Sequence, residues 1–220
     1  MVRKVLLMCG IISSVLYIGT DILASMLWQG YSYANQSISE LNAIGAPTRP
    51  LTLALFSVYG LLVIAFGIGV WASAGEKRSL RVAAIVLVVY AVVGLATNWF
   101  SPMNLRGSET SANDVGHIVL TSLEVLSIVL FIAFGSGAAG KGFRIYSIAT
   151  ILVLVAAGAV AGFLATQMTA QAASTPWAGI VERVNIYATM LWILMFSSVL
   201  LRGQAAAPPR VAAAWETDSG

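Results

Sequence analysis

The sequence predicts an all-α, polytopic membrane protein built as a bundle of six transmembrane helices. Of its 220 residues, 59% are hydrophobic and only 10% are charged, and the mean hydropathy is +0.87. Soluble domains contain about 25% charged residues, so this composition excludes a soluble globular chain and an intrinsically disordered one. Six segments have the roughly 20 apolar residues that a helix needs to cross a hydrocarbon core, and none alternates as a barrel strand does.

The six spans follow one another with short connections. They are predicted in chain order at about Val5–Trp28, Leu51–Ala74, Val82–Phe100, Val115–Ala139, Ile145–Gln167 and Gly179–Leu201. Each is expected to be helical because lipid cannot hydrogen-bond a free backbone. Together they form a transmembrane domain over residues 1–203, and the Ala- and Pro-rich residues 204–220 are predicted to be a disordered cytoplasmic tail.

The distribution of basic residues predicts the orientation. If the N-terminus is cytoplasmic, nine Lys and Arg residues lie in cytoplasmic segments, and only Arg49, Arg106 and Arg183 lie in outer ones. This excess follows the positive-inside rule and predicts that both termini are cytoplasmic. We therefore expect a multi-pass protein of the cytoplasmic membrane whose partners include membrane lipids. Twelve basic residues spread along the chain give no nucleic-acid footprint, and the oligomeric state stays open.

The longest outer connection, about Gln29–Pro50, contains a helix signal. Ser37 and Glu40 have the spacing of a capping box, in which each side chain bonds the other residue's backbone N–H. A short amphipathic helix is therefore predicted here, with Ile38, Leu41 and Ile44 on one face and Gly45 near its end. The alternative is an irregular polar loop.

Ionisable residues inside the spans are the strongest functional signal. A carboxylate at the centre of a bilayer costs roughly 2.5–3.5 kcal/mol on insertion scales, so it normally faces the bundle interior or a watery cavity. Such polar groups gather in the outer halves of the spans, and Asp114, His117 and Glu124 share one helical face. This asymmetry predicts a polar pocket that opens outward. The candidate ligand-binding residues are Asp21, Glu40, Asp114, His117, Glu124, Glu182 and Arg183.

Structural roles are the alternative for each candidate. Asp21 could accept hydrogen bonds from Thr20, a neighbouring tyrosine or Arg183, and Asp114 with His117 could cap a helix start. Glu124 has no basic neighbour in sequence, so we expect it to be neutral or bound to a partner from another span.

Catalytic motifs are missing from the sequence. There is no Gly-x-Ser-x-Gly nucleophile motif and no phosphate-binding glycine loop, and the one cysteine, Cys9, excludes a Cys-based zinc site. A single histidine is fewer than a catalytic zinc site usually uses, so the metal content stays open and no cofactor is predicted.

Several strings resemble a known family. They are Tyr31 with Ser37-Ile38-Ser39-Glu40-Leu41 and Gly45-Ala46-Pro47 in the first outer loop, His117 in span four, and Gly179-Ile180-Val181-Glu182-Arg183 with Trp192 in span six. Over roughly residues 5–202 the chain resembles the six-span prokaryotic membrane family called "domain of unknown function 998". The resemblance implies a compact six-helix bundle in a prokaryotic membrane. It implies no substrate and no catalytic residue.

Three functional hypotheses remain. The first is a binding or transport protein that holds a lipid headgroup or small polar ligand against Arg183, above Asp21, Asp114, His117 and Glu124. Transport predicts a cavity that continues past Glu124. The second is an intramembrane lipid hydrolase, in which His117 acts as base or metal ligand within about 3.2 Å of a carboxylate. The third is a non-catalytic assembly factor whose polar side chains are all satisfied by neighbours. Enzyme activity is therefore undecided, and the first hypothesis is favoured.

Overall fold

The computed structural model describes residues 1–108, 111–170 and 175–205 and is helical almost throughout. Six helices are long and apolar enough to cross a membrane, which confirms the predicted six-helix membrane fold. The predicted tail, 204–220, lies outside the described residues except for its first two positions, which continue the last helix. The elements are α1 (Val2–Leu27), α2 (Ile38–Leu41), α3 (Arg49–Ser73), α4 (Arg78–Phe100), α5 (Ala112–Gly135), the 3-10 turn η1 (Ser136–Ala138), α6 (Lys141–Ala170) and α7 (Ala178–Ala205).

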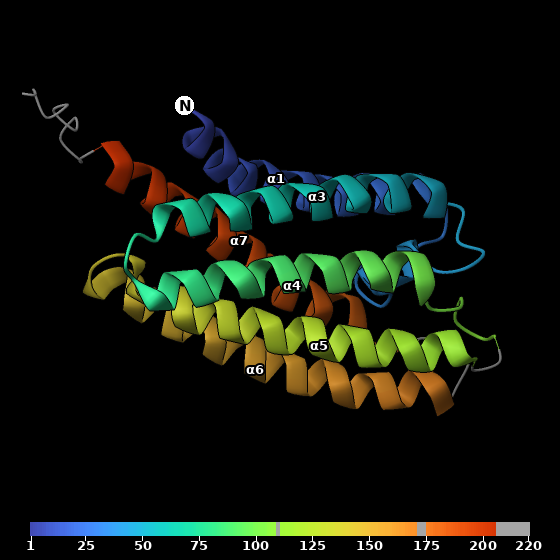
Figure 1. Cartoon of the computed structure of the whole chain (residues 1–220). Helices are drawn as coiled ribbons and strands as arrows, with labels where there is room; N and C mark the ends of the chain where they lie inside the picture. Colours follow the sequence, from blue (N-terminus) through green and yellow to red (C-terminus); the bar gives the residue numbers. More distant parts are fainter. Residues whose placement is uncertain (109–110, 171–174, 206–220) are drawn as a thin grey trace, which may run out of the picture.

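The long helices form a ring. α1 packs between α3 and α7, α3 packs on α4, α4 on α5, and α6 on α7, while α5 and α6 touch more sparsely. Figure 1 shows the six helices running the length of the molecule. One end carries the first residues of α1, the α3–α4 turn and η1, and we call it the termini end. The other carries α2 and the α4–α5 connection, and we call it the α2 end.

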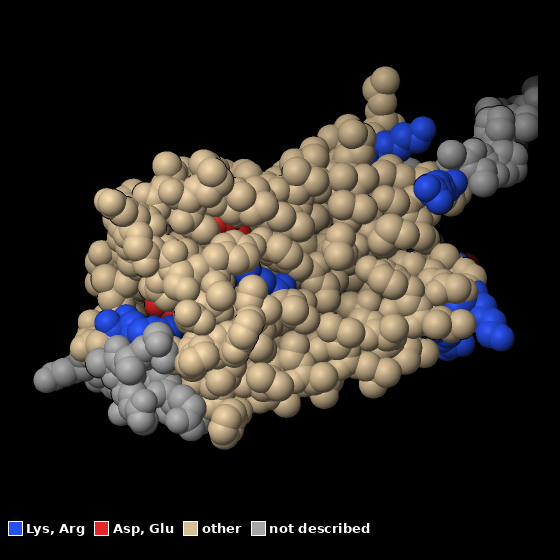
Figure 2. Space-filling model, turned by 180° about the vertical axis from the view of Figure 1, so that it is seen from behind, with Lys and Arg blue, Asp and Glu red and all other residues tan. Residues whose placement is uncertain are grey.

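The middle of the outer surface is apolar. Large hydrophobic side chains on every long helix are exposed, as is expected where lipid rather than water surrounds the protein. Most of the Lys and Arg visible in Figure 2 lie at one end of the molecule. The helix bounds assign eight described basic residues to the termini end: Arg3, Lys4, Lys77, Arg78, Arg81, Lys141, Arg144 and Arg202.

The predicted short helix is present as α2, a single turn. Ser37 and Glu40 form the capping box, with the Glu40 backbone N–H donating to the Ser37 hydroxyl at 3.2 Å and the Ser37 N–H donating to the Glu40 carboxylate at 3.2 Å. Ile38 and Leu41 are buried against the bundle. Ile44 is 40% exposed and does not share that face, because the helix has already ended at Leu41.

Aromatic side chains fill the interior of the helix bundle in the half nearer the termini end. Trp192 is fully buried, and its ring lies 5.6 Å from that of Phe131 and 4.6 Å from that of Phe196, measured between centroids. The indole N–H of Trp192 donates to the Ser147 hydroxyl at 2.9 Å, so its one polar atom is satisfied within the apolar core. This half of the bundle is therefore closed by packing.

Two glycines allow α1 and α3 to approach closely. A Cβ at Gly69 would lie 2.9 Å from the Leu6 Cβ and 3.0 Å from the Leu6 backbone, and a Cβ at Gly10 would lie 2.8 Å from the Phe66 ring. Small residues at such contacts let helix backbones pack tightly in a membrane, where van der Waals contact is a main source of helix association.

We expect Gly69→Val to destabilise the fold by about 1–3 kcal/mol, because the α1 backbone would have to move away from the added side chain. The measurement is the apparent melting temperature of the detergent-solubilised protein. Gly19→Val is the matched control, since no atom lies within 4 Å of a Cβ at that exposed helical position. Equal melting temperatures for the two variants would contradict the close approach.

The predicted orientation can be tested by labelling, because Cys9 is the one cysteine of the chain. In a Cys9→Ser background, we expect a membrane-impermeant maleimide to label the Ser108→Cys variant in intact spheroplasts. The Glu76→Cys variant, in the turn at the termini end, should be labelled only after the membrane is permeabilised. Both native residues are exposed, so accessibility to the reagent is not limited by packing. The reverse pattern would show an inverted topology.

Candidate functional site

The structure separates the seven predicted site residues into three groups. Asp21 and Arg183 form an ion pair between α1 and α7. Glu40 and Asp114 hold the connecting segments at the α2 end. The remaining three line one cavity inside the bundle, and they are His117, Glu124 and Glu182.

The ion pair is bidentate and buried. The Arg183 Nε and Nη2 atoms donate to the two carboxylate oxygens of Asp21 at 2.9 and 2.8 Å, and the Tyr187 hydroxyl donates to the same carboxylate at 2.6 Å. The exposed fractions of the two charged side chains are 4% and 0%. Of the partners that the sequence left open for Asp21, the structure selects Arg183 and a tyrosine, while Thr20 donates to the Leu16 carbonyl instead.

The same guanidinium also holds the loop that precedes α2. Its Nη1 atom donates to the carbonyl oxygens of Tyr33 at 2.7 Å and Gln36 at 3.0 Å, and Nη2 donates to the Tyr31 hydroxyl at 2.8 Å. Burial raises the pKa of the Tyr31 phenol, which therefore stays neutral at physiological pH. Gly179 is required here because any Cβ would collide with both loop carbonyls. Arg183 is thus fully engaged within the protein and is not part of the cavity lining.

The second group stabilises loops. Glu40 accepts from Arg106 at 2.6 Å, which joins α2 to the α4–α5 connection. Asp114 accepts from the Asn104 backbone N–H at 2.7 Å and from the Ser111 backbone N–H at 2.8 Å, so it caps the start of α5 and holds the same connection. Neither carboxylate lines the cavity.

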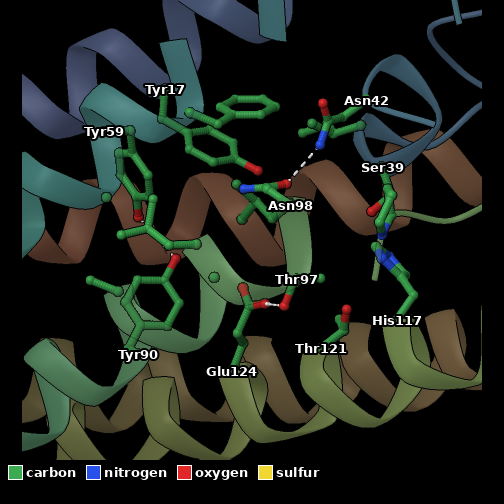
Figure 3. A pocket seen from close by; sticks show the side chains of 18 of the residues that line it. Tyr17, Ser39, Asn42, Tyr59, Tyr90, Thr97, Asn98, His117, Thr121 and Glu124 are labelled. Carbon is green, nitrogen blue, oxygen red and sulfur yellow. Dashed lines mark hydrogen bonds between the residues drawn. The ribbon is translucent and has the colours of Figure 1, made fainter. Parts of the chain in front are cut away.

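A cavity of about 130 Å³ lies between the helices in the half nearer the α2 end. Side chains from α1, α2, α3, α4, α5 and α7 line it. Figure 3 shows Tyr59 and Tyr90 at one end of it, His117 and Ser39 at the other, and Glu124 between them. A site for one water needs roughly 10–15 Å³, so this space has room for several waters or a small organic group.

Glu124 is the most unusual group in this cavity. Its Oε1 atom lies 2.6 Å from the Thr97 hydroxyl, which also lies 2.9 Å from the Val93 carbonyl oxygen. The hydroxyl has one hydrogen for two acceptors, so it cannot fully satisfy the carboxyl group. The described residues give the Oε2 atom no hydrogen-bond donor and give the carboxyl group no salt-bridge partner.

The end of the cavity nearer the bundle centre is closed by two tyrosines. The hydroxyl oxygens of Tyr59 and Tyr90 lie 2.9 Å apart, and the Tyr90 ring contacts Phe131 at a centroid distance of 5.6 Å. One phenolic hydrogen is used between the two rings, and the other has no acceptor among the described side chains and backbone. Beyond Phe131 lies the packed aromatic core, so the cavity ends at this level.

Amide and carboxylate groups hold α2 over the other end. The Asn42 side-chain amide nitrogen donates to the Asn98 side-chain Oδ1 atom at 2.8 Å. The Asn98 amide nitrogen has no acceptor among the described residues. Glu182 accepts from the Ile38 backbone N–H at 2.7 Å and from the Ser39 hydroxyl at 2.9 Å, so both of its oxygens fix α2 in place.

His117 bonds a backbone carbonyl instead of a carboxylate. Its Nδ1 atom lies 3.1 Å from the Ser101 carbonyl oxygen, which can only accept, so this nitrogen carries the hydrogen and Nε2 of the neutral ring is an acceptor. The His–carboxylate contact that the hydrolase hypothesis requires is not formed among the described residues. Within the residues that the structure describes, no three His, Cys, Asp or Glu side chains converge as metal ligands would.

The sequence did not single out the aromatic wall of the cavity. Tyr17, Tyr59 and Tyr90 lie in apolar spans, where tyrosine is usually taken as core or interface. A signal was available, because a phenolic hydroxyl deep in a span needs a hydrogen-bond partner and so indicates a polar neighbour. The sequence did not indicate the role of Thr97, which contacts Glu124, because a threonine in a helix commonly donates to a backbone carbonyl of the same helix.

We expect Arg183→Met to lower the stability by about 3–5 kcal/mol, because it leaves the Asp21 carboxylate buried without its cation. The Asp21→Asn/Arg183→Met double variant should lose less than the sum of the two single losses, since it removes both charges. The stabilities of the single and double variants are compared by their melting temperatures in detergent, with Glu76→Gln at an exposed site as the control. Additive losses would rule out the pairing.

Comparison with known proteins identifies the family. The model of the family described as "Protein of unknown function (DUF998)" matches residues 11–199, which include all of the cavity lining and the ion pair. No significant match to the chain was found among curated proteins or among solved structures. The match covers most of the chain and agrees with the resemblance seen in its outer-loop and span-six strings. The chain is a multi-pass membrane protein that belongs to the DUF998 family.

Proposed function

We propose that this protein binds a small polar ligand or a lipid headgroup in the cavity beside Glu124, from the α2 end of the bundle. The observation that carries the proposal is the contrast between two sets of buried polar groups. Asp21 and Arg183 satisfy each other, whereas the Glu124 Oε2 atom faces a cavity and has no donor among the described residues.

Several other atoms of the cavity wall have unused hydrogen-bonding capacity. They include the Asn98 amide nitrogen, the His117 Nε2 atom and one phenolic hydrogen of the Tyr59–Tyr90 pair. Buried polar groups are normally paired, so a wall that presents both donors and acceptors favours an occupant that supplies the missing partners. Ordered water would satisfy the same groups in the absence of ligand.

The shape of the cavity favours binding over a continuous pathway. The Tyr59–Tyr90 contact closes it, and the buried rings of Phe131 and Trp192 lie beyond. Transport would require these side chains to move apart. The hydrolase hypothesis receives less support, because His117 donates to a backbone carbonyl and Asp114 is used to cap α5.

The charge distribution supports a proposal about location. We propose that the protein lies in a cytoplasmic membrane with the termini end in the cytoplasm, because the eight basic residues assigned to that end follow the positive-inside rule. The cavity would then lie in the extracytoplasmic half of the bilayer. Membrane lipids surround the protein there, so the ligand could come from a lipid headgroup or from a free solute.

We expect Gly94→Leu to prevent ligand retention. A Cβ at Gly94 would lie 3.5 Å from the Glu124 Oε2 atom without a clash, so a longer side chain would occupy the ligand space. Native mass spectrometry of the protein released from mild detergent should show a bound small molecule or lipid on the wild type and a loss of at least about tenfold in the variant.

Gly162→Leu is the matched control, because it makes the same change on α6, where no atom lies within 4 Å of a Cβ. It should retain the adduct as the wild type does, and the melting temperatures of both variants should stay near that of the wild type. An adduct that survives Gly94→Leu would contradict the binding function, and so would a wild-type protein that carries no adduct and is stabilised by no added ligand.

A further inference from the structure

We propose that the group bound in this cavity is a small organic ammonium, held by the Glu124 carboxylate. This inference rests on the proposed binding function and adds the chemical class of the ligand. It is carried by the charges, the hydrogen-bonding atoms and the aromatic rings of the cavity wall.

The charges of the wall favour a cation. The lining residues described for the cavity include two carboxylates, Glu124 and Glu182, and no Lys or Arg. Two arginines at the α2 end of the bundle are engaged elsewhere, since Arg183 pairs with Asp21 and Arg49 donates to the backbone carbonyl oxygens of Asn42 and Asn98. An anionic ligand would therefore meet a wall without a cation, and it would be repelled by the carboxylates.

The two carboxylates are not equivalent. Both oxygens of Glu182 are occupied by the Ile38 N–H and the Ser39 hydroxyl, so this residue positions α2. Glu124 keeps its Oε2 atom open, and its Oε1 atom shares the Thr97 hydroxyl with the Val93 carbonyl oxygen. An N⁺–H donor from the ligand would complete the coordination of Glu124 and neutralise a charge that is costly within a membrane.

The other polar atoms near the cavity are suited to a ligand that donates hydrogen bonds. The His117 ring presents Nε2 as an acceptor because Nδ1 holds the hydrogen bonded to Ser101. The Asn98 amide nitrogen can donate to an oxygen carried by the same ligand, as in an amino alcohol. The wall thus has acceptors for an ammonium and a donor for a neighbouring oxygen.

Aromatic rings form another part of the wall. Tyr17, Phe56, Tyr59 and Tyr90 line the cavity, and the Tyr17 ring lies 4.7 Å from Phe56 and 4.8 Å from Tyr59. Aromatic faces attract ammonium groups, more strongly where water is excluded. A cavity of about 130 Å³ that is lined by both a carboxylate and tyrosine rings therefore fits an ammonium headgroup better than a sugar, a phosphate or a neutral alcohol.

The test compares ligands of different charge on the purified protein. Ethanolamine hydrochloride and ethylamine hydrochloride are titrated at constant ionic strength, with sodium phosphate as the anion, glycerol as the neutral ligand and sodium chloride as the salt control. We expect the two ammonium compounds to raise the apparent melting temperature of the wild type by several degrees at saturation, and the other three to leave it unchanged.

Two variants localise the effect. Glu124→Gln keeps the side-chain shape and removes the charge, and it should weaken ammonium binding at least about tenfold in isothermal titration calorimetry. Glu76→Gln, an exposed carboxylate at the termini end, should bind as the wild type does. If Glu124→Gln does not fold, Gly94→Leu provides the second variant, and it should abolish the ammonium-dependent shift.

An experiment with lipids distinguishes the two sources of the ammonium group, which are a lipid headgroup and a free solute. The protein is reconstituted in nanodiscs that contain equal phosphatidylethanolamine and phosphatidylglycerol, and the lipids that remain bound are identified by native mass spectrometry. Selective retention of phosphatidylethanolamine by the wild type, lost in Glu124→Gln, identifies a lipid headgroup. Binding of soluble ethanolamine or ethylamine without lipid selectivity identifies a free ligand. Either result supports the ammonium inference.

The outcomes also separate the two proposals. Stabilisation by phosphate or glycerol that Gly94→Leu removes, with no effect of the ammonium compounds, would overturn the ammonium inference and leave the binding function standing. Ammonium binding that is unchanged in Glu124→Gln would overturn it as well. A wild type with no adduct and no response to any of the ligands would overturn both.

Discussion

The bidentate ion pair between Asp21 and Arg183 connects the first and last spans of the bundle and fixes the loop above them. Because α1 and α7 are neighbours in the ring, this one contact brings the ends of the transmembrane domain together. The remaining N–H groups of Arg183 hold the carbonyls of Tyr33 and Gln36, which precede α2. The position of α2, and hence the roof of the cavity, depends on this pair.

The same requirement, that polar groups within lipid find partners inside the protein, explains why Glu124 stands out. Around the ion pair, donors and acceptors match closely. At Glu124 they do not, since one threonine hydrogen serves two acceptors and the second carboxylate oxygen faces a cavity. A site that is incomplete by itself is the arrangement expected where a ligand, rather than the protein, provides the last partners.

The bundle is divided along its length into two halves with different roles. Near the termini end, Trp192, Phe131 and Phe196 pack together with the one polar atom of Trp192 satisfied, and glycines bring α1 and α3 into close contact. This half provides rigidity. Near the α2 end, the helices enclose the cavity, and the Tyr59–Tyr90 contact marks the boundary between the halves. Ligand chemistry is thereby confined to the half with the polar side chains.

By itself the sequence determined the six membrane helices and the capping box of α2, because hydropathy, span length and a three-residue spacing are local properties. It also located the costly polar residues at one end of the spans. Only the tertiary structure decided their partners. Asp21 and Arg183 are 162 positions apart, and Thr97 and Glu124 are 27 apart. Their pairing depends on how the helices are ordered around the ring and rotated about their axes. Hydropathy does not encode either quantity. Only the assembled bundle therefore distinguishes the ion pair of Asp21 and Arg183, which has a structural role, from the Glu124 carboxylate in the cavity.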